Sequence, residues 1–541
     1  MQSSSWISEL ELIFLLLLLF VVVFAWLARK LGTPYPIVLV VAGLLLGMIP
    51  GIPKVSLNPE MVFLVVLPPL LYAAAWLTPW REFQFNLVSI CMLAFGLVGF
   101  TVFGVAETSH KVFPGFDLRL GFVLGAVVAT TDAIAATSIA KRVGLPQGIV
   151  DVLEGESLVN DATGLLALEF AIAMVVDGRT PSVGQGLFRL IYLTVGGLAL
   201  GHVIGRIAEW FENQIDDGPI EIVLSILIPY GTYLAAELIH TSGVLAVVAC
   251  GLYLSNKSAR FFSANVRMQA WAVWDAFTFI LNGLVFVLIG LQLPFVLAGI
   301  REYSLRQLVL YGALFSTLVI LLRLVWMFPA GRIANLIRRK LLHQNVPPPS
   351  GRQLFIVGWT GMRGVVALAA AISLPEKLAN GVDFPQRNLI IFLTFSVILV
   401  TLVLQGLTLP PLIRALGLAG KTGRNQEEDQ ARREMVDEAL KHLKIERDHD
   451  HGKFRDVYDE IEEQYRHRLG ALQENESGAE NGESAAHVAR YQELLKELIQ
   501  IERHTAVSLR NQGRLNDEAL RRIEHELDLT EIRLSLMDSK T

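Results

Sequence analysis

Long apolar runs separated by short polar connections fill the first three quarters of the chain. Each run approaches the roughly 20 residues that an α-helix needs to cross the hydrocarbon core of a bilayer. A window of about 19 residues therefore predicts a series of membrane-spanning helices. Thirteen runs meet this description, near residues 12–27, 35–52, 59–77, 86–107, 118–139, 148–176, 184–208, 219–238, 242–255, 269–298, 305–329, 352–374 and 388–413.

The pattern changes after residue 415. No later run is long and apolar enough to span a membrane, and apolar residues such as Leu494, Leu498 and Ile501 recur at helical spacing among charged ones. Asn516, followed by two acidic residues, predicts the N-cap of a last helix. We expect a transmembrane domain over 1–415 and a charged helical tail over 416–541. The pattern of the tail fits a solvated surface as well as a regulatory or self-associating module.

Composition supports this division of the chain. Of 541 residues, 53% are hydrophobic and only 18% are charged, which excludes a series of soluble domains and indicates a membrane protein. Residues 421–541 carry 20 Lys and Arg against 28 Asp and Glu, whereas the residues before them carry 26 against 23. The net charge of −5 therefore averages two different parts and does not indicate a nucleic-acid partner. Cys91 and Cys250 both lie in apolar runs, which excludes a disulfide framework and a cysteine-based zinc site.

Basic residues are distributed unequally between the two sets of connections. Sixteen Lys and Arg residues lie in connections on one predicted side of the membrane, and nine lie on the other side. By the positive-inside rule, this distribution predicts a multi-pass protein of the cell membrane whose N-terminus is outside and whose C-terminal tail is cytoplasmic.

Charged side chains interrupt the apolar runs at four places. Such groups cost several kcal/mol at bilayer depth, so they are candidates for function. They are Asp132, preceded by Thr130 and Thr131; Glu154, Glu156 and Glu169 with Ser157, Asn160 and Asp161 in the run near 148–176; Arg323; and Arg363.

Spacing within the run near 148–176 indicates a binding site. Asn160 follows Glu156 by four residues. Asp161 follows Ser157 by four residues, so a helix brings these oxygen-bearing side chains onto one broad face. A monovalent cation needs several oxygen ligands in place of its water, and a carboxylate that binds it can also hold a proton. We expect Asp161 and Asp132 to form one site for either ion, although a lone buried Asp could instead hydrogen-bond across a helix interface.

The segments around Asp132 and Arg363 resemble each other in kind. Each combines Thr, Gly and a single charge inside an apolar run, in the fifth and twelfth predicted helices. Interrupted segments at matching positions of two halves predict an inverted-repeat transporter. In a crossing of this type, Asp132 would offset the positive helix N-termini and Arg363 the negative C-termini. Alternatively, Gly358, Gly361 and Gly364 only permit close helix packing.

Residues 155–162 (GESLVNDA) resemble the signature helix of the cation:proton antiporter-1 family, which comprises the bacterial NhaP and eukaryotic NHE type sodium/proton antiporters. The resemblance extends from about residue 10 to residue 415. Further segments that resemble the family are 67–74 (LPPLLYAA), Thr131 with Asp132, 282–292 (NGLVFVLIGLQ), Arg323 and 361–364 (GMRG).

The resemblance implies an all-α polytopic fold of about thirteen transmembrane helices, built as an inverted repeat with two interrupted crossing helices. It implies a homodimer that exchanges Na⁺ or Li⁺, sometimes K⁺, for H⁺. Asp161 matches the family's cation- and proton-binding carboxylate, and Ser157, Asp132 and the backbone of Thr131 match further Na⁺ ligands. Ala133 stands where the family has proline, so the local geometry of this helix break departs from the family pattern.

The resemblance also assigns the neighbouring polar residues. Glu156 matches a carboxylate that forms a structural ion pair with Arg323, and Asn160 matches the amide beside the binding carboxylate. Family members with this Asn-Asp pair are generally electroneutral, which implies one cation per proton. Arg363 matches the arginine of the Gly-x-Arg-Gly segment.

These observations favour a secondary active antiporter that serves intracellular pH and sodium homeostasis, works by alternating access in a lipid membrane, needs no organic cofactor and is not an enzyme. The chain has no Walker motif, which disfavours transport driven by ATP. One alternative is a cation channel. Another is an intramembrane aspartyl hydrolase, in which two Asp share a proton, but neither Asp132 nor Asp161 lies in a Gly-x-Gly-Asp setting.

Overall fold

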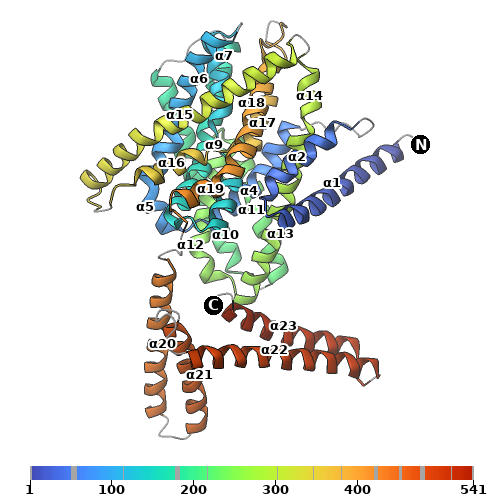
Figure 1. The fold of residues 1–541 in the computed structure, drawn as a ribbon, viewed down its shortest axis with the longest axis vertical. Helices are drawn as coiled ribbons and strands as arrows, with labels where there is room; N and C mark the ends of the chain where they lie inside the picture. The colour runs from blue at the N-terminus through green and yellow to red at the C-terminus, as the bar shows by residue number, and fades with distance from the viewer. Residues whose placement is uncertain are drawn as a thin grey trace. The chain divides into compact units, whose positions relative to one another are not determined.

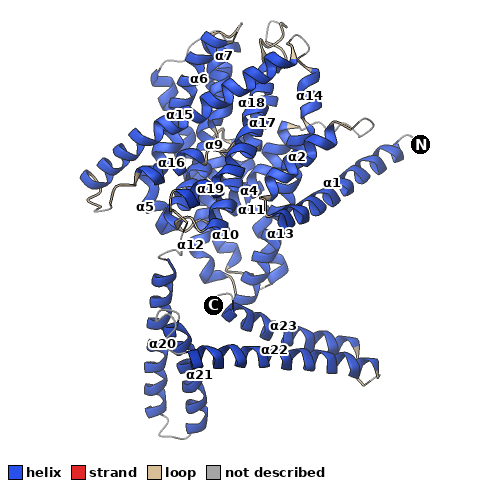
Figure 2. Cartoon of the chain, in the orientation of Figure 1, coloured by secondary structure: helices blue, strands red, loops and turns tan. Residues whose placement is uncertain are grey.

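The chain divides into two compact units, Met1–Gly420 and Lys421–Thr541, in a computed structural model (Figure 1). The described residues are helical apart from turns, connections and one isolated bridge between Lys377 and Asp383 (Figure 2). The structure describes residues 3–49, 58–113, 115–176, 183–215, 217–300, 303–344, 347–378, 381–419, 424–449, 454–474, 482–512 and 514–538.

The helices of the first unit follow the thirteen predicted runs in order. Ten helical runs in the described part of the chain are long and apolar enough to cross a membrane, and α2, α12 and the α16–α17 pair complete the series. The predicted all-α polytopic architecture is confirmed. The runs are α1 (Ser3–Leu31); α2 (Tyr35–Gly47); α3, η1 and α4 (Pro59–Met61, Val62–Val66, Leu67–Leu77); α5, η2 and α6 (Trp80–Cys91, Met92–Leu97, Val98–Val112); α7 and α8 (Leu118–Ala129, Ala133–Val143); α9 (Gln147–Val176); α10 (Val183–Glu212); α11 (Gly218–Leu238); α12 (Gly243–Phe261); α13 and α14 (Ala264–Leu291, Leu293–Ala298); α15 (Leu305–Lys340); α16 and α17 (Gly351–Trp359, Val365–Ile372); and α18, η3 and α19 (Arg387–Val400, Thr401–Gln405, Gly406–Ala415).

Helix α15 is longer than its apolar run predicts. The run ends near residue 329, but the helix continues to Lys340. Near its end, Arg338 donates hydrogen bonds to the backbone oxygen of Phe85 and to Oδ1 of Asn86, both at 3.0 Å, and its guanidinium lies over the Phe85 ring. These contacts with α5 stabilise a basic helical extension that hydropathy alone does not reveal.

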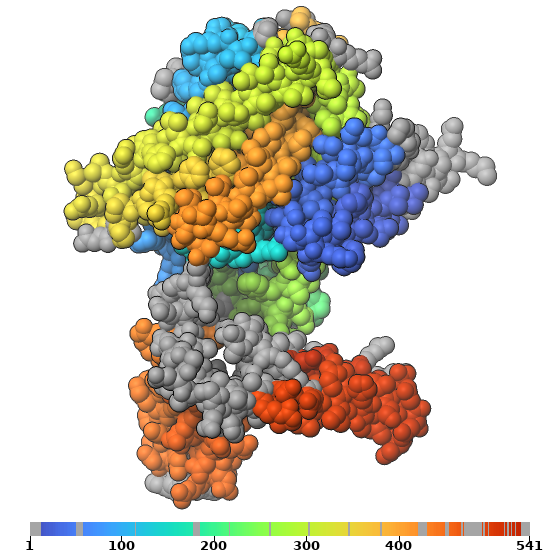
Figure 3. Space-filling model, in the orientation of Figure 1, coloured from blue at the N-terminus to red at the C-terminus, as the bar shows by residue number. Residues whose placement is uncertain are grey.

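Two helices are interrupted in the middle of the first unit. Residues 130–132 separate α7 from α8, and residues 360–364 separate α16 from α17. The two extended segments meet: the backbone N–H of Asp132 donates to the backbone oxygen of Met362 at 2.9 Å. This is the crossing of interrupted helices that the sequence predicts. In the space-filling view, α15 (yellow-green) lies beside α18, η3 and α19 (orange) on one face of this unit (Figure 3).

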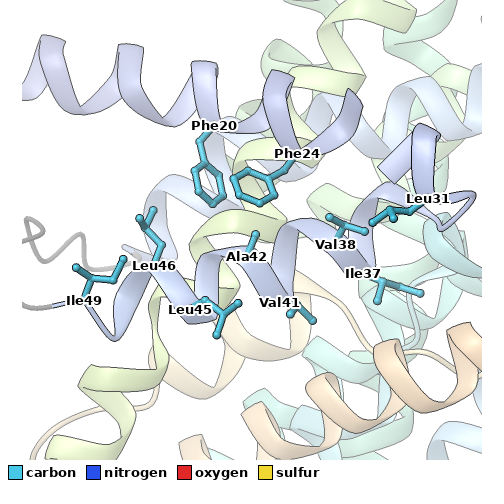
Figure 4. A pocket seen from close by; sticks show the side chains of 10 residues that line it. All are labelled: Phe20, Phe24, Leu31, Ile37, Val38, Val41, Ala42, Leu45, Leu46 and Ile49. Atoms are coloured by element: carbon cyan, nitrogen blue, oxygen red, sulfur yellow. The ribbon is translucent and has the colours of Figure 1, made fainter. Parts of the chain in front are cut away.

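An apolar groove opens between α1 and α2. Ten apolar side chains line it, among them Phe20 and Phe24 from α1 and Val41 and Leu45 from α2 (Figure 4). The groove contributes no polar group that could bind an ion, so it plays no part in the candidate site.

The second unit consists of two helical hairpins. In the second hairpin, Arg503 pairs with Asp528 at 2.6 Å and with Glu531 at 2.8 Å, and Arg447 makes comparable contacts in the first hairpin. The Asn516 side chain accepts a hydrogen bond from the N–H of Ala519 at 2.7 Å, which confirms the predicted N-cap. The hairpins pair α20 (Arg424–His449) with α21 (Arg455–Glu474), and α22 (Gly482–Asn511) with α23 (Asp517–Asp538).

Candidate functional site: the helix crossing and α9

Asp132 lies at the N-terminal ends of two half-helices. Its Oδ1 accepts a hydrogen bond from the N–H of Ile134 at 2.8 Å and so caps α8. A Cβ atom added to Gly364, the residue before α17, would lie 2.6 Å from the Asp132 Cβ and 2.7 Å from its Cγ. The first N–H of α8, from Ala133, donates to Ser157 Oγ at 3.3 Å. The carboxylate therefore faces the positive ends of both α8 and α17, and Ser157 brings α9 to the same point.

The hydroxyl of Thr131 joins the crossing to α9. It donates to Oε1 of Glu156 at 3.1 Å and accepts from Nδ2 of Asn160 at 2.6 Å. The carboxylate and the amide are four residues apart on α9, so one side chain of the crossing reaches both. All three side chains are buried. The spacing seen in the sequence thus turns one face of α9 towards the crossing.

A buried ion pair lies behind this contact. Arg323 of α15 donates to both oxygens of Glu156, with 2.8 Å between Nη2 and Oε2. The guanidinium also donates to the backbone oxygen of Val357, from Nε at 3.3 Å and from Nη2 at 3.1 Å. Glu156 and Arg323 are each 1% exposed. Gly361 packs directly on the Arg323 side chain, where a Cβ atom would collide with it, so glycine is required for this close approach.

Arg363 lies where helices end. Its Nε donates to the backbone oxygen of Val128 in the last turn of α7 at 3.2 Å, and its Nη1 donates to the backbone oxygen of Gly361, just after α16. Its own N–H donates to Thr401 Oγ1 at 3.2 Å. The guanidinium therefore faces carbonyl oxygens at the negative ends of α7 and α16, as Asp132 faces the positive ends of α8 and α17.

Asp161 differs from the other carboxylates. It is 7% exposed, and among the described residues its side chain has neither a hydrogen bond nor an ion-pair partner. Close by, Oδ1 of Asn160 is also buried without a hydrogen-bond partner. A buried oxygen without a hydrogen-bond partner costs free energy. The Asp161 carboxylate and Oδ1 of Asn160 can therefore accept a ligand that binds reversibly.

Two other carboxylates of α9 lie outside this cluster. Glu154 pairs with Lys141 at the end of α8 at 2.7 Å. Glu169 pairs with Arg189 at 3.2 Å, and both of these side chains are partly exposed. Among the described residues, neither Glu154 nor Glu169 has a hydrogen bond or an ion pair with the crossing.

The sequence did not point to two residues of the site, and it did not reveal the contact that a third one makes. Thr401 binds the backbone of the crossing, Val357 provides the carbonyl for Arg323, and Gly364 makes room for Asp132. A threonine in an apolar run is too common to single out, and a carbonyl has no sequence signal. Gly364 was named for helix packing and as part of the segment 361–364, but its close approach to Asp132 was not predicted.

Comparisons with known proteins identify the relatives of this chain. The transmembrane model of the sodium/hydrogen exchanger family matches residues 15–415. The chain is 32% identical over 503 residues to an uncharacterized Na⁺/H⁺ exchanger of Mycobacterium tuberculosis, covering 92% of this chain and 91% of that protein. It is 32% identical to the Na⁺/H⁺ antiporter ApNhaP of Aphanothece halophytica, covering 76% of this chain and 75% of the relative.

Another relative is longer than this chain. The sodium, potassium, lithium and rubidium/H⁺ antiporter of Bacillus pumilus is 36% identical over 423 residues, covering 76% of this chain but only 62% of that protein. Among solved structures, the sodium proton antiporter MjNhaP1 of Methanocaldococcus jannaschii superposes with a TM-score of 0.57 at 21% identity, over 78% of this chain and 100% of that one. At this level of identity, the match establishes the fold.

Two interrupted helices that cross beside buried carboxylates are an arrangement typical of secondary transporters. The chain belongs to the sodium/hydrogen exchanger family. The predicted family, antiporter fold and antiport activity are thereby confirmed, and the protein is a transporter and not a hydrolase.

Proposed function

We propose that this antiporter exchanges one Na⁺ or Li⁺ for one H⁺, with K⁺ as a further candidate, at a site centred on Asp161. One observation carries the proposal: Asp161 is the carboxylate at the crossing without a partner among the described residues. Glu156 is paired with Arg323, and Asp132 caps α8. A carboxylate that exchanges a cation for a proton cannot at the same time be bound by a permanent ion-pair partner.

The surrounding oxygens suit a small cation. Asp161 provides the exchangeable carboxylate, and Ser157, Asp132 and Thr131 provide further oxygens as Na⁺ ligands. The unpartnered Oδ1 of Asn160 adds an acceptor at the same level of α9. Either a bound cation or a bound proton neutralises Asp161, so the loaded site can change its access from one side of the membrane to the other at lower cost than an empty charged site.

The same contacts support a ratio of one to one. Arg323 binds both oxygens of Glu156, and Asp132 is bound at the helix ends, so the proposal assigns the exchanged proton to neither of them. Asn160 cannot titrate. Asp161 is then the one group of this cluster that gains and loses a proton in each cycle, and the exchange of one monovalent cation for that proton moves no net charge.

The proposal also covers the transported cations, the membrane topology and the oligomeric state. One relative is named as an antiporter of sodium, potassium, lithium and rubidium, which supports testing K⁺ beside Na⁺ and Li⁺. The excess of basic connections supports a cell-membrane protein with an external N-terminus and a cytoplasmic tail. We further propose a homodimer that serves intracellular pH and sodium homeostasis, with the tail, 416–541, as a separate cytoplasmic domain.

Exchange in proteoliposomes tests the proposal. The purified protein is reconstituted, a pH gradient is imposed, and its collapse is followed after addition of Na⁺, Li⁺, K⁺ or choline. Na⁺ or Li⁺ should collapse the gradient and choline should not. Proton movement that proceeds equally with choline, or cation movement that ignores the opposing proton gradient, would exclude coupled exchange.

A further inference from the structure

The π-helical turn η2 is not part of the site described above, yet it contacts two helices of that site. It interrupts the run between Trp80 and Val112, and its carbonyl groups are offset from α-helical register. Two of them accept hydrogen bonds from other helices. Thr163 Oγ1 of α9 donates to the Ala94 oxygen at 2.6 Å, and Trp326 Nε1 of α15 donates to the Met92 oxygen at 3.1 Å.

These donors belong to the two helices that carry the buried ion pair. Thr163 follows Glu156 by seven residues, about 10.5 Å along a helix axis, and Trp326 follows Arg323 by three. Helix α9 is therefore bound at two positions along its axis, by the ion pair at Glu156 and by η2 at Thr163. Asp161 lies between these two positions.

Thr163 and Asp161 also differ in the direction in which their side chains leave α9. Thr163 comes two residues after Asp161, a rotation of about 200°, so their side chains leave α9 on nearly opposite sides. The hydroxyl is bound on the side of α9 that also carries Glu156, seven residues earlier, whereas Asp161 leaves the helix on the nearly opposite side. A bond on the side of α9 opposite Asp161 can set the position of the carboxylate along the helix axis without occupying the site.

The Thr163 hydroxyl makes its shorter hydrogen bond to a carbonyl outside its own helix. A threonine within a helix commonly donates to a carbonyl of its own preceding turn. Here the Asn160 oxygen is available at 3.0 Å, but the bond to Ala94 is shorter, at 2.6 Å. On the other side of η2, a Cβ atom at Gly96 would lie 2.6 Å from Cζ2 of Trp326, so the turn has a glycine where the indole approaches.

We propose that η2 fixes the position of α9 along its axis relative to the transport site. Thr163, through its bond to Ala94, is then the residue that positions Asp161 for the cation. The inference rests on the proposed role of Asp161. If the threonine were needed only for packing, valine, which has the same shape, would replace it without effect on cation binding.

The test compares Thr163→Val with Thr163→Ser in reconstituted protein. Thr163→Val should raise the KM for Na⁺ or Li⁺ about three- to tenfold, the effect of one lost hydrogen bond, while kcat changes less. Thr163→Ser keeps the hydroxyl and should retain a KM near that of the unchanged protein. Thr394→Val is the matched control, because Thr394 is fully buried and its hydroxyl bonds to Ile390 of its own helix at 2.8 Å.

The outcomes separate this inference from the proposed function. An unchanged KM in Thr163→Val, or equal losses in the valine and serine variants, would overturn the positioning role. If Thr163→Val does not fold, Trp326→Phe decides: it removes the donor to Met92, and an unchanged KM in that variant would also overturn the inference. Asp161→Asn is measured in parallel, and retained exchange in that variant would overturn the proposed function instead.

Discussion

Arg323 and Glu156 face each other with two parallel hydrogen bonds in the interior of the membrane unit, and each side chain is 1% exposed. The carboxylate that the guanidinium holds is five residues before Asp161 on the same helix. The pair thus occupies both oxygens of Glu156, whereas the side chain of Asp161 has no partner among the described residues. A guanidinium suits this task because its planar donors match a carboxylate bidentately.

Removing one member of this pair should leave an uncompensated buried charge. Glu156→Gln and Arg323→Gln should each lower the free energy of unfolding by about 3–5 kcal/mol. The double variant should lose less than the sum of the two, because neither charge is then left alone. Thermal unfolding in detergent measures the cycle. Strict additivity of the two losses would contradict an energetic coupling between these side chains.

Replacing Asp161 should abolish exchange. Asn keeps the volume of the side chain but cannot ionise, so Asp161→Asn can neither neutralise a cation nor carry a proton. Thermal stability should stay near that of the unchanged protein, because the carboxylate has no partner to lose among the described residues. Na⁺-driven or Li⁺-driven proton movement in proteoliposomes is the measurement, and any exchange well above that of empty vesicles argues against the assignment.

The crossing should not tolerate a methyl group at Gly364. A Cβ atom there would lie 2.6–2.7 Å from Asp132 carbon atoms, and overpacking of this kind costs about 1–3 kcal/mol. Gly364→Ala should therefore lose stability and exchange together. Gly99→Ala is the matched control, since a Cβ atom at Gly99 would meet nothing within 4 Å. Equal behaviour of the two variants would show that the close approach at Gly364 is not required.

Exchange should be insensitive to membrane potential. A potential of 100 mV is worth about 2.3 kcal/mol for each net charge moved, whereas a ratio of one cation to one proton moves none. Valinomycin with K⁺ gradients sets the potential, and Na⁺ or Li⁺ serves as the substrate so that the clamping ion does not compete. A potential-dependent end-point would mean that a second group, Glu156 or Asp132, titrates during turnover.

Much of this protein could be predicted from one sequence. Thirteen apolar runs became the helical runs of the membrane unit in the same order, because hydropathy is the property that a bilayer selects. The polar residues of α9 share a face because helical spacing is local. The cost of charge at bilayer depth also identified Asp132, Asp161, Arg323 and Arg363 without any structure.

Only the tertiary structure decided which of these groups are held and which are not. The hydrogen bond from Asp132 to Met362, the bond from Arg363 to Val128 and the contact of Thr163 with η2 join segments that are 69 to 235 residues apart. The π-helical turns and the extension of α15 to Lys340 likewise depend on neighbours and not on hydropathy. Local pattern determines what a segment can become, but a carboxylate binds an exchangeable ion only when the packed helices around it provide no permanent partner, and that condition depends on contacts between distant parts of the chain.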